Sequence, residues 1–305
     1  MITKYGTQWG AIPQTAGRVL WVAPAASYAV DGRTYTASDN NDGLSPERAL
    51  VTINRAWDLV RANEGEVIVL LPGTHSPTAS ITADVAGVTM IGLPGGRGHF
   101  RKQRASIAAV TGDQNLNVTA ADIELAYLHF IPVTADTAID ASSAATRMHV
   151  HNCSFDMATP AVSTGTKAIE YLGAAADGII EECYFHSDGA QGEAVATLSA
   201  VRLTIRRNEI YLSAGTWAAA MRTGAAADGV LIYENYFHAG DATITAGILG
   251  TTGGTASAVA AWRNIFPDSA TVPVDTFDAG TAELAENYIA GVGSTDGGVL
   301  VTAIT

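Results

Sequence analysis

Apolar residues recur along this chain in short blocks that end in nearly the same way. From about residue 120 onward, seven blocks end on a large apolar residue, here called the anchor, and successive anchors are 23 to 30 residues apart. The anchors are Phe130, Phe155, Phe185, Ile210, Phe237, Phe266 and Ile289. A period of this length indicates stacked structural repeats.

Two further apolar columns lie five and seven positions before the anchors, as Ile205 and Leu203 lie before Ile210. Apolar residues two positions apart are typical of one face of a β-strand. A second short strand recurs between successive anchors, at 138–139, 168–169, 194–195, 219–220 and 246–248. Strands this short cannot bury a face alone, so the pattern predicts parallel coils stacked roughly 4.8 Å apart around one core.

A column of small and amide residues lies two positions before the anchors. Its members are Leu128, Cys153, Cys183, Asn208, Asn235, Asn264 and Asn287. Asn tolerates left-handed backbone at a bend, and its amide can bond to an Asn in the next coil, so the column predicts an Asn ladder inside a turn. The two Cys fill the same slot in adjacent coils, where a disulfide is sterically conceivable but a cytosolic origin argues against it.

The column three positions before the anchors alternates in charge. It contains Asn152, Glu182, Arg207, Glu234, Arg263 and Glu286. Outward neighbours on parallel strands predict an ion-pair ladder, in which each exposed pair contributes roughly 0–1 kcal/mol. Its main effect is on register, because a slip would place like charges together.

The N-terminal part of the chain follows a different pattern. Residues 1–20 form a predicted irregular arm, and apolar residues at helical spacing after Thr52 predict a helix over about 52–62 with Thr52 as N-cap. An apolar run from Val67, stopped by Pro72 and Gly73, predicts a buried strand. We therefore divide the chain into an arm (1–20), a cap region (21–66) and a solenoid (67–305).

The order of these segments resembles the pectate-lyase-like right-handed parallel β-helix superfamily. The matching segments are N-D-G-L-S-P at 41–46, T-I-N-R-A at 52–56 and V-I-V-L-L-P-G-T at 67–74. The resemblance implies an all-β chain, a single-stranded right-handed parallel β-helix or solenoid, whose open end is covered by the capping helix. The superfamily includes lyases, hydrolases, phage tailspikes and inert structural proteins, so fold alone does not give function. The whole chain also resembles proteins of tailed phages and prophages.

Charge and composition narrow the partners. The net charge of −13 argues against nucleic acid, no stretch is apolar enough to span a membrane, and the N-terminus lacks the apolar run of a signal peptide. An extracellular type of solenoid without a secretion signal suggests a virion protein released by lysis. A local group of basic residues has two interpretations: a solvated loop, or a contact surface for an acidic protein or an anionic glycan. It comprises Arg97, Arg101, Lys102 and Arg104.

Asp140 and Glu170 are the best candidates for catalysis. Each follows an Ile at the same position of adjacent coils, 15 residues before Phe155 and Phe185. One coil step is close to the roughly 5–5.5 Å that separates the carboxyls of retaining glycosidases. The alternative interpretation is two outward acids beside short loops.

No metal or cofactor is predicted. His149 and His151 lie on one face of a strand with Glu124 and Glu181 nearby, but a metal site needs three or four convergent ligands. For a lyase the resemblance implies Asp ligands for Ca²⁺ and a nearby basic residue, and the strand columns contain no stacked Asp ladder.

The leading hypothesis for function is a non-enzymatic bacteriophage virion protein, a homotrimeric capsid decoration or cement protein. In this hypothesis the arm attaches the trimer to the virion through Tyr5, Trp9 and Pro13. The alternative is a phage tailspike or tail protein that binds or degrades a host polysaccharide as a glycoside hydrolase or lyase, using Asp140 and Glu170. A third hypothesis is a passive glycan-binding module.

Overall fold

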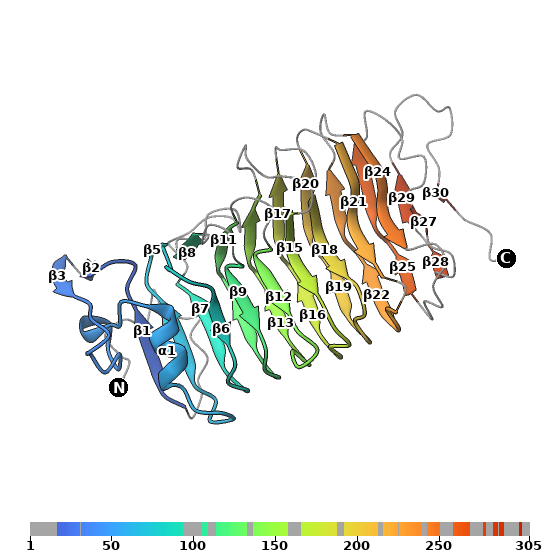
Figure 1. Ribbon diagram of the computed structural model, residues 1–305. Helices are drawn as coiled ribbons and strands as arrows, with labels where there is room; N and C mark the ends of the chain where they lie inside the picture. The colour runs from blue at the N-terminus through green and yellow to red at the C-terminus, as the bar shows by residue number, and fades with distance from the viewer. Residues whose placement is uncertain are drawn as a thin grey trace.

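Strands make up almost all of the regular structure in the described part of the chain (Figure 1). The computed structural model describes residues 17–30, 32–93, 105–108, 114–132, 137–157, 166–187, 192–212, 216–224, 226–238, 243–250, 259–268, 277–278, 283–285, 287–289 and 299–300. None of the helical segments among them has the length and hydropathy needed to span a bilayer.

Three sheets of parallel strands run along the stack, and each complete coil adds one strand to each sheet. Sheet 1 contains β1 (Val19–Val22), β4 (Val67–Leu70), β7 (Thr89–Gly92), β10 (Glu124–Ala126), β13 (His149–His151), β16 (Ile179–Glu181), β19 (Thr204–Arg206), β22 (Val230–Tyr233), β25 (Val259–Trp262) and β28 (Glu283–Ala285). Sheet 2 contains β5 (Gly73–His75), β8 (Ala105–Ala108), β11 (His129–Ile131), β14 (Ser154–Asp156), β17 (Tyr184–Ser187), β20 (Glu209–Leu212), β23 (Tyr236–His238), β26 (Ile265–Asp268), β29 (Asn287–Ile289) and an antiparallel β30 (Val299–Leu300). Sheet 3 contains β6 (Ile81–Ala83), β9 (Leu116–Val118), β12 (Ile139–Ala141), β15 (Thr166–Tyr171), β18 (Gly192–Thr197), β21 (Thr216–Thr223), β24 (Thr243–Gly250) and β27 (Phe277–Asp278).

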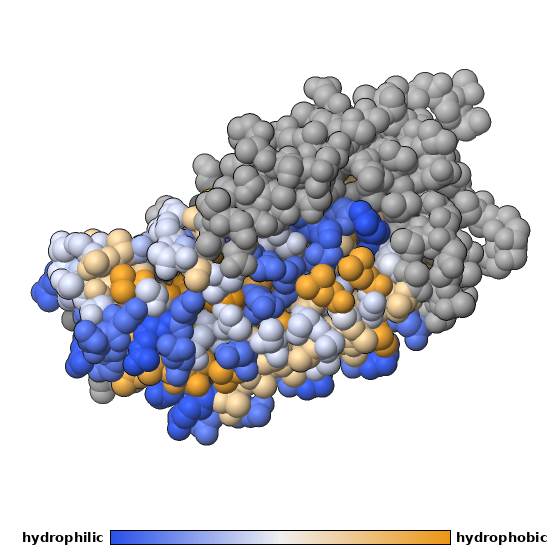
Figure 2. Space-filling model, in the orientation of Figure 1, coloured by the Kyte–Doolittle hydropathy of each residue, from blue (hydrophilic) through white to orange (hydrophobic). Residues whose placement is uncertain are grey.

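The predicted fold class is confirmed as a mostly β, parallel β-solenoid. The repeat-derived strands supply sheets 1 and 2, and the second strand column supplies sheet 3. Sheet 1 begins earlier than residue 67, because Val19 of β1 lies beside Val67 of β4 in a parallel pair. Figure 2 shows a mosaic of polar and apolar residues over the visible described surface.

The anchors form the centre of the core. Phe130, Phe155 and Phe185 are fully buried register partners, and their rings stack with centroids 5.1 and 4.8 Å apart. The column five positions before the anchors is also buried, as Ile180 and Ile205 show. Burying large apolar side chains in continuous columns is the main stabilising term of the solenoid.

The predicted Asn ladder is confirmed. Nδ2 of Asn208 donates to Oδ1 of Asn235 at 2.9 Å, and Nδ2 of Asn235 donates to Oδ1 of Asn264 at 3.0 Å. The second amide hydrogen of Asn235 reaches the backbone carbonyl of Ile205 at 3.0 Å. Cys183 fills the same slot as a free buried thiol and points to the carbonyl of Val150 at 3.7 Å, and Cys153 is also free.

The left-handed backbone lies one residue before the Asn column, contrary to the sequence prediction. The residues concerned are Tyr127, Asn152, Glu182, Arg207, Glu234 and Arg263, with φ between 52° and 56°. The corner needs one left-handed residue to turn the chain from sheet 1 into sheet 2. The side-chain amide of the Asn that follows it can therefore hydrogen-bond to the Asn of the next coil.

The charged corner column only partly forms the predicted ladder. Arg207–Glu182 and Arg263–Glu234 approach only to 3.6 and 3.9 Å, and Glu286 lies outside the described residues. Shorter pairs occur at the corner that precedes sheet 1, where Arg147 contacts Asp122 at 2.6 Å and Arg202 contacts Asp177 at 2.6 Å. The sequence pattern missed these pairs because they lie outside the aligned strand columns.

The cap contains a β2–β3 hairpin (Ser27–Val30 and Arg33–Thr36), a 3₁₀ turn η1 (Pro46–Arg48) and α1 (Ile53–Leu59). Thr52 is the N-cap of α1, as predicted, and its hydroxyl accepts from the Arg55 N–H. The helix ends earlier than residue 62 because the Arg61 N–H donates to the buried carboxylate of Glu66 at 2.8 Å. Arg18 donates to the same carboxylate at 2.6 Å, which ties the start of β1 to the end of the cap.

We expect Asn235→Ala to lower the free energy of unfolding by several kcal/mol. The change leaves the Asn208 amide and the Ile205 carbonyl buried without their partner, and each such group costs roughly 1–3 kcal/mol. Urea melts of the purified chain measure the loss. The exposed Asn40→Ala is the control and should shift stability by no more than about 0.5 kcal/mol.

The apolar columns should matter more than the surface charges. Ile205→Ala, a large-to-small change at a fully buried position, should cost roughly 2–5 kcal/mol. Arg207→Ala should cost roughly 0–1 kcal/mol, because this half-exposed side chain shares Glu181 with Arg206. Denaturant melts that gave the reverse order would contradict the assignment of inward and outward faces.

Candidate functional site

Charged side chains gather on the outer face of sheet 3. Asp140 of β12 is the register partner of Glu170 of β15, and both alternate with core residues, so their side chains point away from the core. Glu193 of β18 and Lys167 of β15 are register partners in the same region. These acids are nevertheless nearly covered, since Asp140 is 4% exposed, Glu170 6% and Glu193 4%. We call Asp140, Lys167, Glu170, Glu193 and Arg222 the sheet-3 cluster.

Two cations partly neutralise the acids. Nζ of Lys167 forms an ion pair with Oε1 of Glu170, and Nη2 of Arg222 forms one with Oε1 of Glu193. Thr137 adds a long hydrogen bond of 3.5 Å to Oε2 of Glu170. Neither oxygen of Glu193 has an aligned hydrogen-bond donor among the described residues.

Asp140 has the most unusual environment. Its Oδ1 is buried and has no hydrogen-bond partner among the described residues. Burial raises the pKa of Asp140, the nearby Glu170 carboxylate raises it further, and hydrogen bonds with Gln114 and Thr137 oppose the shift. Burial likewise raises the pKa of Glu193 against the attraction of Arg222 and Lys167.

The arrangement provides an acid next to a carboxylate. Burial raises the pKa of Asp140, which makes it the better proton donor of the pair, and the ion pair with Lys167 orients the Glu170 carboxylate. Neighbouring strands are roughly 4.8 Å apart, close to the roughly 5–5.5 Å between the carboxyls of retaining glycosidases. Asp140 and Glu170 therefore have the placement of a general acid and a nucleophile.

The structure places only some of the predicted site residues. It brings Asp140 and Glu170 together as predicted and adds Lys167, Glu193 and Arg222, which the sequence analysis did not single out. Their only signal is a charge inside strands that are otherwise rich in small residues. Seven predicted binding residues lie outside the described part of the chain: Tyr5, Trp9, Pro13, Arg97, Arg101, Lys102 and Arg104.

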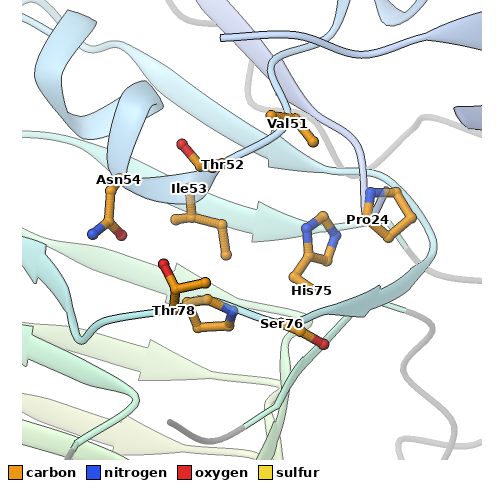
Figure 3. A pocket seen from close by; sticks show the side chains of 9 residues that line it. Pro24, Val51, Thr52, Ile53, Asn54, His75, Ser76 and Thr78 are labelled. Carbon is orange, nitrogen blue, oxygen red and sulfur yellow. The ribbon is translucent and has the colours of Figure 1, made fainter. Parts of the chain in front are cut away.

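A pocket of about 400 Å³ lies away from these charges, between the start of α1 and the segment that joins β5 to β6 (Figure 3). Asn54, Thr78 and the buried His75 line it, and none of its lining residues carries a permanent charge. Nε2 of His75 lies within hydrogen-bond distance of the Leu71 carbonyl oxygen, at 2.9 Å, and burial lowers the pKa of His75. The pocket offers space and neutral polar groups, but no pair of groups suited to proton transfer.

Solved structures resemble this chain at low sequence identity. An alginate lyase from Paenibacillus sp. str. FPU-7 has a TM-score of 0.52 and 16% identity, with 78% of this chain and 92% of that chain covered. XylC in complex with xylose has a TM-score of 0.49 and 9% identity, covering 89% of this chain and 67% of that one. Pectate lyase Pel9A has a TM-score of 0.39 and 12% identity, covering 90% and 78%.

The likeness to the alginate lyase structure shows the fold alone, which is a parallel β-helix. No family model and no curated protein sequence matches the chain. Any functional statement therefore depends on the residues of this chain.

The raised pKa of Asp140 predicts a pH-dependent effect of Asp140→Asn. Because the folded state binds the Asp140 proton more tightly than the unfolded state, the stability that this group contributes is lost as pH rises through its folded pKa. The amide keeps the shape without the charge. Asp140→Asn should therefore be more stable than the wild type at pH 7, and the difference should shrink towards pH 4 in urea melts.

Asp177→Asn is the matched control, with the opposite sign. Hydrogen bonds from Arg202 lower the pKa of Asp177, so its stabilising effect is present at neutral pH and is lost as pH falls. Asp177→Asn should lose stability at pH 7 and approach the wild type in acid. Equal behaviour of the two variants would contradict the assigned environment of Asp140.

Proposed function

We propose that the chain binds and hydrolyses a polysaccharide at the sheet-3 cluster. The observation that supports this function is the buried acid pair Asp140–Glu170, in which one carboxyl has a raised pKa and the other is paired with Lys167. The likeness to an alginate lyase supports only the fold, and the substrate class is taken from the chemistry of a paired-carboxyl site.

The two carboxyls have different roles in this proposal. Asp140 holds a proton and donates it to the glycosidic oxygen as the bond to the leaving sugar breaks. Glu170 attacks the anomeric carbon and forms a glycosyl ester, and Asp140 then removes a proton from the water that hydrolyses it. Lys167 orients Glu170 for attack through their ion pair.

A second candidate is a non-enzymatic structural protein, for which we propose a bacteriophage virion as the location. The observation that favours it is the near-complete burial of the cluster's three acids together with its internal ion pairs, which would help to fix the register between coils. Under this candidate the chain forms a homotrimer on a phage capsid, with residues 1–20 as the attachment arm. We propose the trimer, the virion location and a contact role for the basic residues at 97–104 as parts of this candidate.

Turnover assays separate the two candidates. The full chain is incubated with a panel of neutral and uronic-acid polysaccharides, while reducing ends and the ultraviolet absorbance of unsaturated products are recorded. Hydrolysis should produce reducing ends without unsaturated products. Asp140→Asn and Glu170→Gln should each lower the rate by roughly 10²–10⁴-fold.

Glu182→Gln is the control, because Glu182 is a half-exposed corner residue whose side chain contacts Arg207 at 3.6 Å. It should keep the wild-type rate. Unsaturated products would indicate a lyase reaction instead of hydrolysis. If no polymer gave either product, the result would favour the structural candidate.

A further inference from the structure

A second cluster of chemically active side chains lies on a different face, on the outside of sheet 1. His149 and His151 alternate along β13, so both side chains point to the same side of the sheet. Glu124 of β10 lies beside His149 in the adjacent coil, and Glu181 of β16 lies beside His151 on the other side. The fold therefore surrounds two imidazoles with a carboxylate from each neighbouring coil.

Glu124, His149 and His151 each offer one ligand atom, and these three atoms lie within 4.8 Å of one another. Nε2 of His151 is 2.8 Å from Oε1 of Glu124, and the two imidazole rings stack with centroids 4.3 Å apart. The three side chains are between 18% and 36% exposed, so an ion can reach them from solvent. No other such group of three occurs in the described part of the chain.

Surrounding residues fix the orientation of these side chains. Oε1 of Glu181 lies 3.0 Å from Nε2 of His149, while Arg206 and Arg207 hold Oε2 of Glu181 at 2.8 and 2.6 Å. The Thr89 hydroxyl donates to Oε2 of Glu124 at 2.8 Å. The Asn152 amide lies 3.1 Å from Nδ1 of His151.

We propose that Glu124, His149 and His151 form a binding site for a divalent transition-metal ion, with Zn²⁺ as the ion that fits best. Two imidazoles and one carboxylate are a typical nitrogen and oxygen ligand set for zinc. Ca²⁺ requires six to eight oxygen ligands, and Mg²⁺ also prefers oxygen, so neither ion suits this set.

The contacts around the cluster match what a bound metal requires. A metal-bound imidazole usually donates its other N–H to a carboxylate or carbonyl. Nε2 of His149 already faces Glu181, which leaves Nδ1 for the ion. Nε2 of His151 faces Glu124 and would bind the ion, and a rotated Asn152 amide would accept from Nδ1.

The ion would take the place of the hydrogen bond between Glu124 and His151. Tetrahedral ligands of Zn²⁺ lie roughly 3.3 Å apart, so Glu124 and His151 need to separate slightly and His149 needs a small rotation. Water would complete the coordination on the solvent side. Because the ligands come from β10 and β13, the ion would also cross-link two coils and stabilise the folded chain.

The test uses the full chain without a histidine tag, stripped with a chelator and dialysed. Zn²⁺ is titrated by calorimetry, Mg²⁺ and Ca²⁺ serve as comparison ions, and Co²⁺ provides a visible absorption spectrum of the bound state. The wild type should bind about one Zn²⁺ per chain and show a higher Tm with Zn²⁺ but not with Mg²⁺. His149→Gln and His151→Gln should each weaken binding by more than about 100-fold, because the loss of even an outer partner costs roughly 10–100-fold.

His186→Gln is the matched control. His186 also pairs with a carboxylate, Asp156, at 3.3 Å on sheet 2, and it belongs to no group of three ligands in the described residues. It should bind Zn²⁺ like the wild type. Circular dichroism melts without metal identify a variant that fails to fold, and Glu124→Gln then provides the test, since an amide can keep the bond to Thr89.

Two results would overturn the site. One is a wild type that binds Zn²⁺ no more tightly than the double variant of His149 and His151. The other is a Co²⁺ spectrum that Glu124→Gln leaves unchanged. Activity at the sheet-3 cluster has no part in these readouts, so the outcome is independent of the proposed function.

Discussion

Parallel register between successive coils is the constraint on which the rest of this structure depends. Each coil places its residues directly beside their counterparts in the next coil, so a residue type that repeats in sequence becomes a continuous column in space. Inside, this produces the stacked rings of Phe130, Phe155 and Phe185 and the Asn ladder. A slip of one residue would exchange the inner and outer faces of a strand, so the buried columns fix the register for the outer ones.

The outer columns acquire their chemistry from that register. Asp140 lies beside Glu170 because β12 and β15 are held in place by core residues on their other face. Two acids at this spacing repel each other, and Lys167 together with the raised pKa of Asp140 limits the cost. The same logic places Glu124 beside His149 on sheet 1. In both clusters, the pairing results from a register that distant apolar residues determine.

The two clusters differ in their surroundings, and this difference separates their proposed roles. The acids on sheet 3 are nearly covered, so burial raises the pKa of Asp140 and of Glu193 and favours proton transfer. On sheet 1 burial would also raise the pKa of Glu181, but hydrogen bonds from Arg206, Arg207 and His149 lower it to about 2. A carboxylate that two arginines hold beside a half-exposed imidazole suits ligand orientation rather than acid catalysis.

Sequence patterns alone predicted the coil period, the inward columns, the Asn ladder, the N-cap of α1 and the pairing of Asp140 with Glu170. The N-cap follows from the helical spacing after Thr52, and the other features follow from residues that repeat at one aligned position of the coils. Tertiary structure decided the position of the left-handed corner residue, because only the geometry of the turn shows which of two adjacent residues bends. It also explains why Gly178, seven positions before the anchor Phe185, interrupts the apolar column: the hydroxyl of Tyr171, from sheet 3, would lie 2.7 Å from a Cβ there. The partners Lys167, Glu193 and Arg222, and the convergence of Glu124 with two imidazoles, depend on side-chain directions and burial across three coils, which no single repeat contains.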